Sequence, residues 1–156
     1  MGTRAQERLR RMYAGGRADA TARAYVRVYN RVVPWGLAPR RWVILEVTGR
    51  RSGRPIRLPL GLADLDGSWY LVSMLGECNW TKNLRAAGGR ATVLRRGRHP
   101  ITTTEVPVAE RAPVIKRYLT KVPGGRPHIP VDHRAPLSEV EKVAERTPVF
   151  LVTGYP

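Results

Sequence analysis

This chain is poor in cysteine and phenylalanine, with one of each in 156 residues, and it has no long apolar run. The single cysteine, Cys78, excludes an internal disulfide and a zinc site built from several cysteines. The densest apolar stretches, such as Trp42–Leu45 and Val149–Val152, are four residues long, whereas a membrane-spanning helix needs about 20. The arginine-rich N-terminus has no apolar segment of the kind found in secretory signals. We therefore expect a soluble cytoplasmic protein.

Acidic residues are also scarce, with 12 against 28 lysines and arginines and a formal charge of +16. Only four of the 28 are lysines, and the first 57 residues carry 14 of the arginines against three acids. A field this positive attracts nucleic acid, acidic lipid, or a ligand rich in phosphate or carboxylate. A GC-rich coding sequence is the alternative, but it explains the ratio of arginine to lysine better than it explains the net charge.

Residues 1–38 form the first of two predicted parts, a basic helical segment. Helices are predicted over 3–13 and 18–33, and prolines at 34 and 39 end the second. Its apolar stripe consists of Ala22, Val26, Tyr29 and Val33, and its basic stripe of Arg23, Arg27 and Arg31. An amphipathic basic helix suits an anionic membrane surface, which would place the protein at the inner membrane face. The alternative is a solvated outer face.

Residues 39–156, the second part, change to short strands joined by turns. Strands are predicted over 42–48, 56–63, 69–74, 91–94, 99–106 and 148–153, and helices over 80–87, 108–121 and 138–146. Asn79 is expected to cap the first of these helices, and Ser138 with Glu141 to form a capping box on the last. Six short strands with peripheral helices predict a mostly β protein, a small antiparallel barrel, rather than a doubly wound sheet.

The first chemical motif is the turn between the first two strands, Thr48-Gly49-Arg50-Arg51-Ser52-Gly53-Arg54-Pro55. Its glycines allow backbone amides to turn toward an anion, and its arginines supply planar forks for phosphate or carboxylate. It is not a P-loop, because the Gly-Lys-Ser/Thr ending is missing and a strand follows. An ordinary basic hairpin turn is the alternative.

The second motif runs from Ser73 to Leu84, where a strand ends and a helix begins. A helix N-terminus offers unpaired amides and the positive end of a dipole, which suits an anion. Trp80 and Leu84 have the i, i+4 spacing of core residues, whereas Asn83 is harder to explain as core.

Hydrolysis and metal chemistry have little support in this sequence. There is no Gly-x-Ser-x-Gly elbow, and His99, His128 and His133 do not have the spacing of metal ligands. Cys78 is expected to be structural, because Glu77 beside it opposes a lowered thiol pKa. No metal site is predicted.

Four segments in order resemble the deazaflavin-dependent nitroreductase family, whose fold is a split β-barrel similar to FMN-binding barrels. They are Leu45–Pro55 leading into Pro59-Leu60, Asp66-Gly67 with Tyr70–Ser73 and Gly76, Trp80–Ala86, and Glu145–Leu151. Together they span roughly residues 42–152. The resemblance implies an antiparallel split β-barrel in 39–156 and a deazaflavin cofactor, coenzyme F420, which carries a phosphate and an acidic polyglutamate tail.

The resemblance also implies roles for individual residues. Arg50, Arg51 and Ser52 would hold the phosphate and the tail, Ser73, Met74 and Gly76 would line the ring, and Trp80 and Asn83 would close the site. Two positions depart from the family pattern. In the family an arginine directly follows the turn proline, whereas here Arg57 stands one position later. Met74 stands where the family often has a lysine. The implied reaction is hydride transfer from reduced cofactor to a quinone, an enone or a nitroaromatic, with orientation and electrostatics supplied by the protein.

The proton donor is a further departure, since the substrate-facing tyrosines of the family have no counterpart in 122–145. Histidine suits the task because its unperturbed pKa is about 6.5. His128 lies between Pro127 and Pro130 in a proline-rich loop, so we expect it, rather than His133, to be the donor; an exposed loop histidine without a catalytic role is the alternative. Loss of the donor would alternatively leave a cofactor or lipid binder without turnover.

Two other interpretations remain open. An FMN-dependent enzyme would keep the barrel, although the acidic tail of the deazaflavin better matches the arginine-rich turn. A nucleic-acid binder would explain the charge, but the tryptophans are scattered and no RNP-like or helix-turn-helix motif is present, so no specific nucleic acid is expected. Barrels of this type often form homodimers, yet nothing in the sequence identifies an interface.

Overall fold

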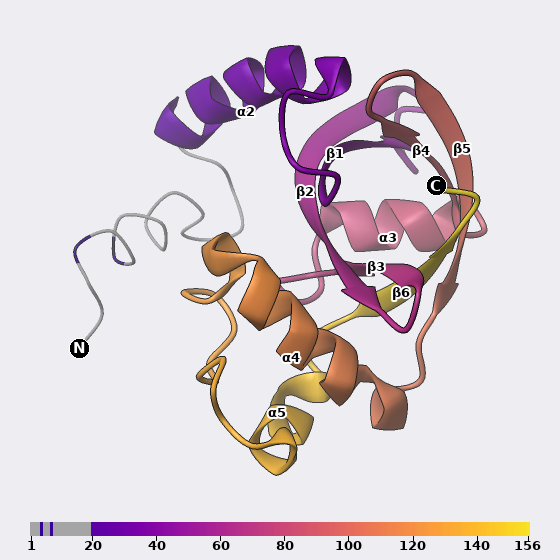
Figure 1. Ribbon diagram of the computed structural model, residues 1–156. Coiled ribbons are helices and arrows are strands. Elements are labelled where there is room, and N and C mark those ends of the chain that lie inside the picture. Colours follow the sequence, from indigo (N-terminus) through magenta and orange to yellow (C-terminus); the bar gives the residue numbers. More distant parts are fainter. Residues whose placement is uncertain (1–3, 5–6, 8–19) are drawn as a thin grey trace.

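The computed structural model describes residues 4, 7 and 20–156 (Figure 1). The helix expected over 3–13 lies outside the described residues. The second predicted helix is present as α2 (Ala20–Val32), followed by the 3-10 turn η2 (Val33–Trp35). Gly36, in a left-handed conformation with φ of 73°, ends this segment, because a side chain at that φ would be strained.

Six antiparallel strands close into a barrel, which confirms the predicted fold class. They are β1 (Trp42–Thr48), β2 (Pro55–Leu65), β3 (Ser68–Val72), β4 (Arg90–Leu94), β5 (Arg98–Glu105) and β6 (Val149–Thr153). Their order around the barrel is β1-β2-β3-β6-β5-β4, and β4 pairs with β1 to complete the ring. Figure 1 shows this ring with α2 at its upper left, beside β1 and β2, and with two later helices at its lower left.

Along each strand the side chains point alternately into the barrel and toward its outer face. Val43, Leu45 and Val47 of β1 belong to the interior cluster, which also contains Phe150 of β6. Ile44 points outward, and it is nonetheless 1% exposed because Val33 of η2 covers it. The end of the predicted N-terminal segment is therefore anchored on the barrel wall.

The register gives the barrel two distinct ends. Thr48 of β1 pairs with Pro55, and Val72 of β3 pairs with Val149, so β1 and β3 finish where β2 and β6 begin. The helix α3 (Asn79–Ala86) lies across this end, with Leu84 packed into the interior cluster, and it is seen through the ring of strands in Figure 1. We call this the α3 end. The turns between β2 and β3 and between β4 and β5 lie at the other, the hairpin end.

A second apolar cluster lies between the outer face of the barrel and two helices. These are α4 (Arg111–Lys121), preceded by η3 (Val108–Glu110), and α5 (Leu137–Ala144), with η4 (Pro123–Gly125) between them. Ile115 and Leu119 of α4 and Val140 of α5 are fully buried there against strand residues such as Ala63. Ile129 of the proline-rich 122–136 segment belongs to this cluster, and it lies beside Met74 of the loop after β3.

Two predicted caps are wrong. The side chain of Cys78, not Asn79, caps α3, in a capping box with Thr81. The last helix begins at Leu137 after Pro136, with no side-chain cap, so Ser138 lies inside the helix and forms no capping box there. Pro136 at the N-cap position has an extended backbone with φ −63° and ψ 158°, of which its ring fixes φ. Among the described residues, no helix has the length and apolar composition to span a bilayer.

Candidate functional site

The arginine-rich turn between β1 and β2 docks on α3 through Arg50. Its Nη1 donates to Oδ1 of Asn83 over 2.7 Å, and its backbone N–H donates to the same oxygen over 3.2 Å. Nη2 donates to Oδ1 of Asn79 over 3.3 Å. Asn83 is only 3% exposed, so this buried amide accepts bonds that bring the two sequence motifs together. Arg50 and Asn83 are thus in direct contact.

The rest of the turn is closed on itself. Gly49 N–H donates to the Arg54 carbonyl and Gly53 N–H to the Gly49 carbonyl, each over 2.8 Å. Ser52 Oγ accepts the N–H of Arg54 over 3.2 Å. These amides are therefore occupied within the turn, and the exposed side chains of Arg51 and Arg54 are the cations that it presents to an anion.

Arg57 lies away from that turn, on the outer face of the barrel. Its Nε donates to Glu46 over 2.7 Å, and Arg98 donates to the other carboxylate oxygen over 2.6 Å. The hydrogen bond from Arg98 is the largest cause lowering the pKa of the Glu46 carboxyl, with Arg57 adding to it and burial opposing both. In this arrangement Arg57 helps to neutralise a carboxylate that is 10% exposed.

The loop after β3 is held by Ser73, which is 1% exposed. Its Oγ donates to the Gly76 carbonyl over 2.5 Å and lies 3.5 Å from Sγ of Cys78. Gly76 has a φ of 69°, and a Cβ there would lie 3.0 Å from the carbonyl oxygen of Arg146. The serine therefore shapes the loop, while the glycine lets it approach the end of α5 closely.

A cavity of about 360 Å³ lies between this loop, the 128–130 segment and the end of α5. Met74, Gly76 and His128 line it, although they come from two distant parts of the sequence. His133 is not among the lining residues; its Nδ1 lies 3.7 Å from Asp132. The structure thus brings His128, and not His133, to the predicted ring-lining loop.

Trp80 lies on the other side of this loop, within α3. Its ring packs on Phe150 of β6 with 5.8 Å between centroids and belongs to the barrel interior cluster. The ring is half-buried. Trp80 therefore has the core role that its spacing indicates, and it is not among the residues that line the cavity.

The opposite wall of the cavity was not predicted. It consists of Val143, Arg146 and Thr147 at the end of α5, together with Ile129 and Pro130. Helical spacing in 138–146 indicates a helix but carries no information about which loop it faces. Only the packing of α5 on α4 places these residues opposite Gly76.

A chain of ion pairs, also unpredicted, joins the two walls of the cavity. Arg85 of α3 donates to Glu77 over 2.7 and 2.8 Å and to Glu105 over 2.7 and 2.8 Å. Arg111 of α4 donates to Glu105 over 3.1 Å, and its Nη1 reaches the carbonyl oxygens of Ala144 and Thr147. These contacts connect the loop that follows β3 to the end of α5.

The charges of this network stabilise one another. Hydrogen bonds from Arg85 are the largest cause lowering the pKa values of the Glu77 and Glu105 carboxyls, and burial opposes them. The same bonds raise the pKa of Arg85, with Glu105 the larger contributor. The guanidinium also lies 5.7 Å from the centroid of the Phe150 ring. Both carboxylates are therefore ionised partners of one arginine near neutral pH.

Comparison with known proteins gives a family match and a set of similar folds. The sequence profile of a family described as F420H(2)-dependent quinone reductase matches residues 20–131. No curated protein matches the chain. A solved F420-H2 dependent reductase (FDR-A) is 24% identical over 73% of this chain and 95% of its own, with a TM-score of 0.51.

Two further solved structures have a similar fold. A protein described as a domain-swapped dimer is 19% identical over 86% of this chain and 100% of its own, with a TM-score of 0.51. A conserved hypothetical protein from Mycobacterium tuberculosis is 15% identical over 83% of this chain and 79% of its own, with a TM-score of 0.53. At these identities the likeness establishes the split-barrel fold.

Proposed function

The chain belongs to the F420H2-dependent quinone reductase family, and from this premise we propose that it transfers a hydride from reduced coenzyme F420 to a quinone. Family membership makes it an F420-dependent reductase; the acceptor and the residue roles are our proposal. The observation that carries it is that α3 holds the arginine-rich turn through Asn83, while the loop leading into α3 lines a cavity with Met74 and Gly76. Enones and nitroaromatics are the other electron-poor acceptors that the same chemistry would reduce.

The residues at the α3 end fit the chemistry of the cofactor. Its phosphate and acidic tail need cationic donors, and Arg51 is exposed on a turn whose position is fixed by Arg50 and Asn83. Its flat ring needs a partly apolar cavity, and the Met74 side lies beside a volume of about 360 Å³. When bound, the cofactor supplies the hydride.

The protein's own contribution would be positioning and proton supply. Arg51 and Ser52 would bind the acidic end of the cofactor, and Arg50 would act through Asn83 to hold the turn in place. Gly76 would allow close approach to the ring, and Trp80 would exclude water from it. His128 would deliver a proton to the oxygen that gains negative charge during reduction.

A binding titration of the purified protein tests this proposal. We expect saturable quenching of the intrinsic fluorescence of F420 by the protein, with weaker or no binding of FMN because FMN lacks the acidic tail. F420 reduced beforehand should then be oxidised when a quinone is added. Tighter binding of FMN than of F420 would favour the FMN alternative, and F420 binding without turnover would leave a cofactor-binding protein.

We also propose that the N-terminal segment contacts an anionic membrane surface. Arg23, Arg27 and Arg31 are exposed on α2, and the next turn exposes Trp35 at 78% and Leu37 at 79%. Exposed tryptophan beside arginine is typical of membrane–water interfaces. Each basic residue near an anionic surface contributes about 1 kcal/mol.

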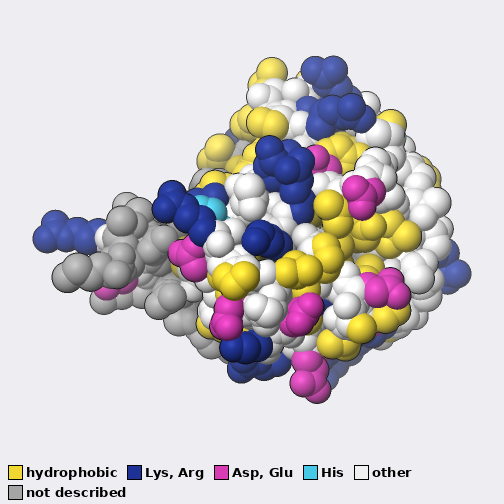
Figure 2. All heavy atoms as spheres, turned by 60° about the horizontal axis from the view of Figure 1, so that its bottom comes forward, with side chains coloured by type: hydrophobic (Ala, Val, Ile, Leu, Met, Phe, Trp, Pro, Cys, Tyr) yellow, Lys and Arg dark blue, Asp and Glu magenta, His cyan; other side chains and the backbone are white. Residues whose placement is uncertain are grey.

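The face formed by α4 and α5 differs, because it mixes acidic, basic and apolar side chains (Figure 2). Exposed Glu139, Glu141 and Glu145 belong to the α5 region. The basic and aromatic α2–η2 segment is therefore the better candidate for contact with acidic lipid. A membrane contact there would suit a lipophilic quinone as the acceptor. A homodimer remains a separate proposal, supported by the domain-swapped form of one protein with a similar fold.

A further inference from the structure

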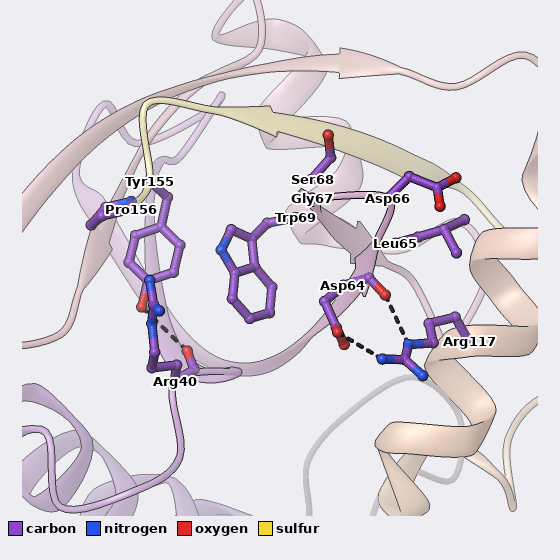
Figure 3. A pocket seen from close by; sticks show the side chains of 10 residues that line it. All are labelled: Arg40, Asp64, Leu65, Asp66, Gly67, Ser68, Trp69, Arg117, Tyr155 and Pro156. Atoms are coloured by element: carbon purple, nitrogen blue, oxygen red, sulfur yellow. Dashed lines mark hydrogen bonds and ion pairs between the residues drawn. The ribbon is translucent and has the colours of Figure 1, made fainter.

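A second cavity, of about 560 Å³, lies at the hairpin end of the barrel (Figure 3). It is lined by the turn between β2 and β3, by the residues that follow β6, and by Arg40 just before β1. The register places these segments at the opposite end from α3 and the proposed cofactor site. A volume of this size is within the range of small-molecule sites, about 300–1,000 Å³.

One side of this cavity is aromatic. Trp69 and Tyr155 have ring centroids 6.1 Å apart and planes tilted by 58°, and in Figure 3 Trp69 lies between Tyr155 and Asp64. The Tyr155 hydroxyl donates to the Arg40 carbonyl over 3.2 Å, and His99 packs edge-on against the same ring at 5.6 Å. The rings are thus held in place before any ligand arrives, which lowers the entropic cost of binding.

The facing side carries a carboxylate that is already neutralised. Asp64 accepts from Arg41 over 3.1 Å at one oxygen and from Arg117 over 2.8 Å at the other. Arg117 Nε also donates to the Asp64 carbonyl over 2.9 Å. Hydrogen bonding to Arg117, with a smaller share from Arg41, lowers the pKa of the Asp64 carboxyl against the effect of burial.

The lining carries two arginines, Arg40 and Arg117, and two aspartates, Asp64 and Asp66, and Arg41 pairs with Asp64 from outside the lining. Two arginines share the one carboxylate of Asp64, and Arg40 is exposed at the rim beside the Tyr155 ring. Asp66 is the other acid in the lining; it lies in the exposed turn, with a φ of 49°. The charge of Asp64 is thus already balanced, and an anionic group placed beside the Tyr155 ring would meet Arg40, which forms no ion pair among the described residues.

We propose that the cavity at the hairpin end binds a planar aromatic ring that carries a carboxylate or phosphate. The ring contacts Trp69 and Tyr155, and the anionic group lies toward Arg40 and Arg117. An aromatic ring of the ligand would stack on the aromatic side of the cavity, while guanidinium groups bind planar anions through paired N–H donors. The site is separate from hydride transfer, since the barrel lies between it and the proposed cofactor site.

The test uses 1-naphthoate and 1-naphthyl phosphate as probes. The matched controls are naphthalene-1-methanol, which lacks the charge, and acetate, which lacks the ring. Calorimetric titration should give saturable binding of at least one anionic naphthalene, at least tenfold tighter than either control. Arg40→Gln should weaken this binding about fivefold to tenfold, as expected for loss of one charge-assisted contact. Trp69→Leu should weaken it by a similar factor, and Trp35→Leu, at an exposed tryptophan outside the cavity, should leave it unchanged.

Three results would overturn the proposal. They are the absence of saturable binding, equal binding of the charged and uncharged naphthalenes, and equal losses from Trp69→Leu and Trp35→Leu. Arg40 is exposed, so its variant still tests the proposal even if Trp69→Leu does not fold. A probe bound at the hairpin end should not compete with F420 for the α3 end; competition would place it at the cofactor site and would also refute the inference.

Discussion

Replacing Arg85 by glutamine tests the ion-pair network that joins the two walls of the α3-end cavity. The substitution removes contacts of 2.7–2.8 Å to both Glu77 and Glu105. The Arg85 side chain is 37% exposed, so each pair is worth less than a buried one, about 0.2–1 kcal/mol. Two pairs with paired hydrogen bonds lead us to expect a loss of about 1–2 kcal/mol in the free energy of unfolding.

The loss should depend on pH in a defined direction. Both carboxyl pKa values are lowered in the folded protein from an ordinary value of 4.5, so the folded state binds fewer protons than the unfolded state in this range. The stabilisation is therefore fully present above pH 4.5 and disappears as the pH falls through the lowered native pKa values. The variant and the native protein should differ at pH 7 and converge below pH 4.5.

Urea denaturation followed by tryptophan fluorescence at several pH values measures this difference. A change of 1 kcal/mol corresponds to about 2–4 °C in Tm for a chain of this size, which gives a second measure. The matched control is Lys142→Gln, which removes a single pair to Glu139 with side chains 68% and 48% exposed, and we expect it to cost less than about 0.5 kcal/mol. An Arg85→Gln loss that is equally large at pH 3.5 and pH 7 would refute the ionic explanation.

Three further outcomes concern function. Arg51→Ala should weaken F420 binding about tenfold or more, and it should weaken the binding of a tail-less analogue less. Arg50→Ala should weaken the binding of both ligands, because it releases the whole turn. Titration of each variant with each ligand measures these affinities. His128→Ala should lower kcat/KM with a quinone about 10²–10⁴-fold, and His133→Ala should retain more than half of the native value. Trp35→Ser should reduce co-sedimentation with vesicles of phosphatidylglycerol, and vesicles of phosphatidylcholine should bind neither protein.

Each of these outcomes has a result that contradicts it. Unchanged F420 affinity in both arginine variants would remove the acidic end of the cofactor from the turn. Near-native activity of His128→Ala would assign the proton to water or to a backbone amide.

For the membrane contact, Val108→Ser is the control, since Val108 is 45% exposed outside the α2–η2 segment. Equal vesicle binding by native protein and Trp35→Ser would exclude a role for the tryptophan. Reversal of Arg23, Arg27 and Arg31 to glutamate should abolish vesicle binding, and native protein that ignores acidic vesicles would leave α2 a solvated face.

Local patterns were sufficient to predict the strands and the arginine-rich turn. The run Trp42–Thr48 is rich in residues that favour strands and marks β1, and the two glycines of 49–53 mark the reversal that follows it. Caps were less predictable, because Cys78 is a rare capping residue and Asn79 next to it is a common one. Proline at 136 likewise started α5 in place of a polar cap.

Contacts between distant segments could not be predicted in the same way. Asn83 was recognisable as an unusual core residue, but its partner Arg50 is 33 positions away. Arg85 and Glu105 are 20 positions apart, and nothing in their local sequence indicates that they meet. His128 reaches Met74 only because α4 and α5 pack on the barrel, which is a property of the assembled core.

The position of β6 has a consequence for how the chain folds during synthesis. This last strand pairs with both β3 and β5, so the ring cannot close until residue 153 has left the ribosome. Until then β3 and β5 each present an unpaired edge, which is open to pairing with another nascent chain. Closure also joins segments about 80 residues apart in sequence, a non-local step of the kind that slows folding. A chain released before Val149 should therefore be prone to aggregation even though five of its six strands are complete.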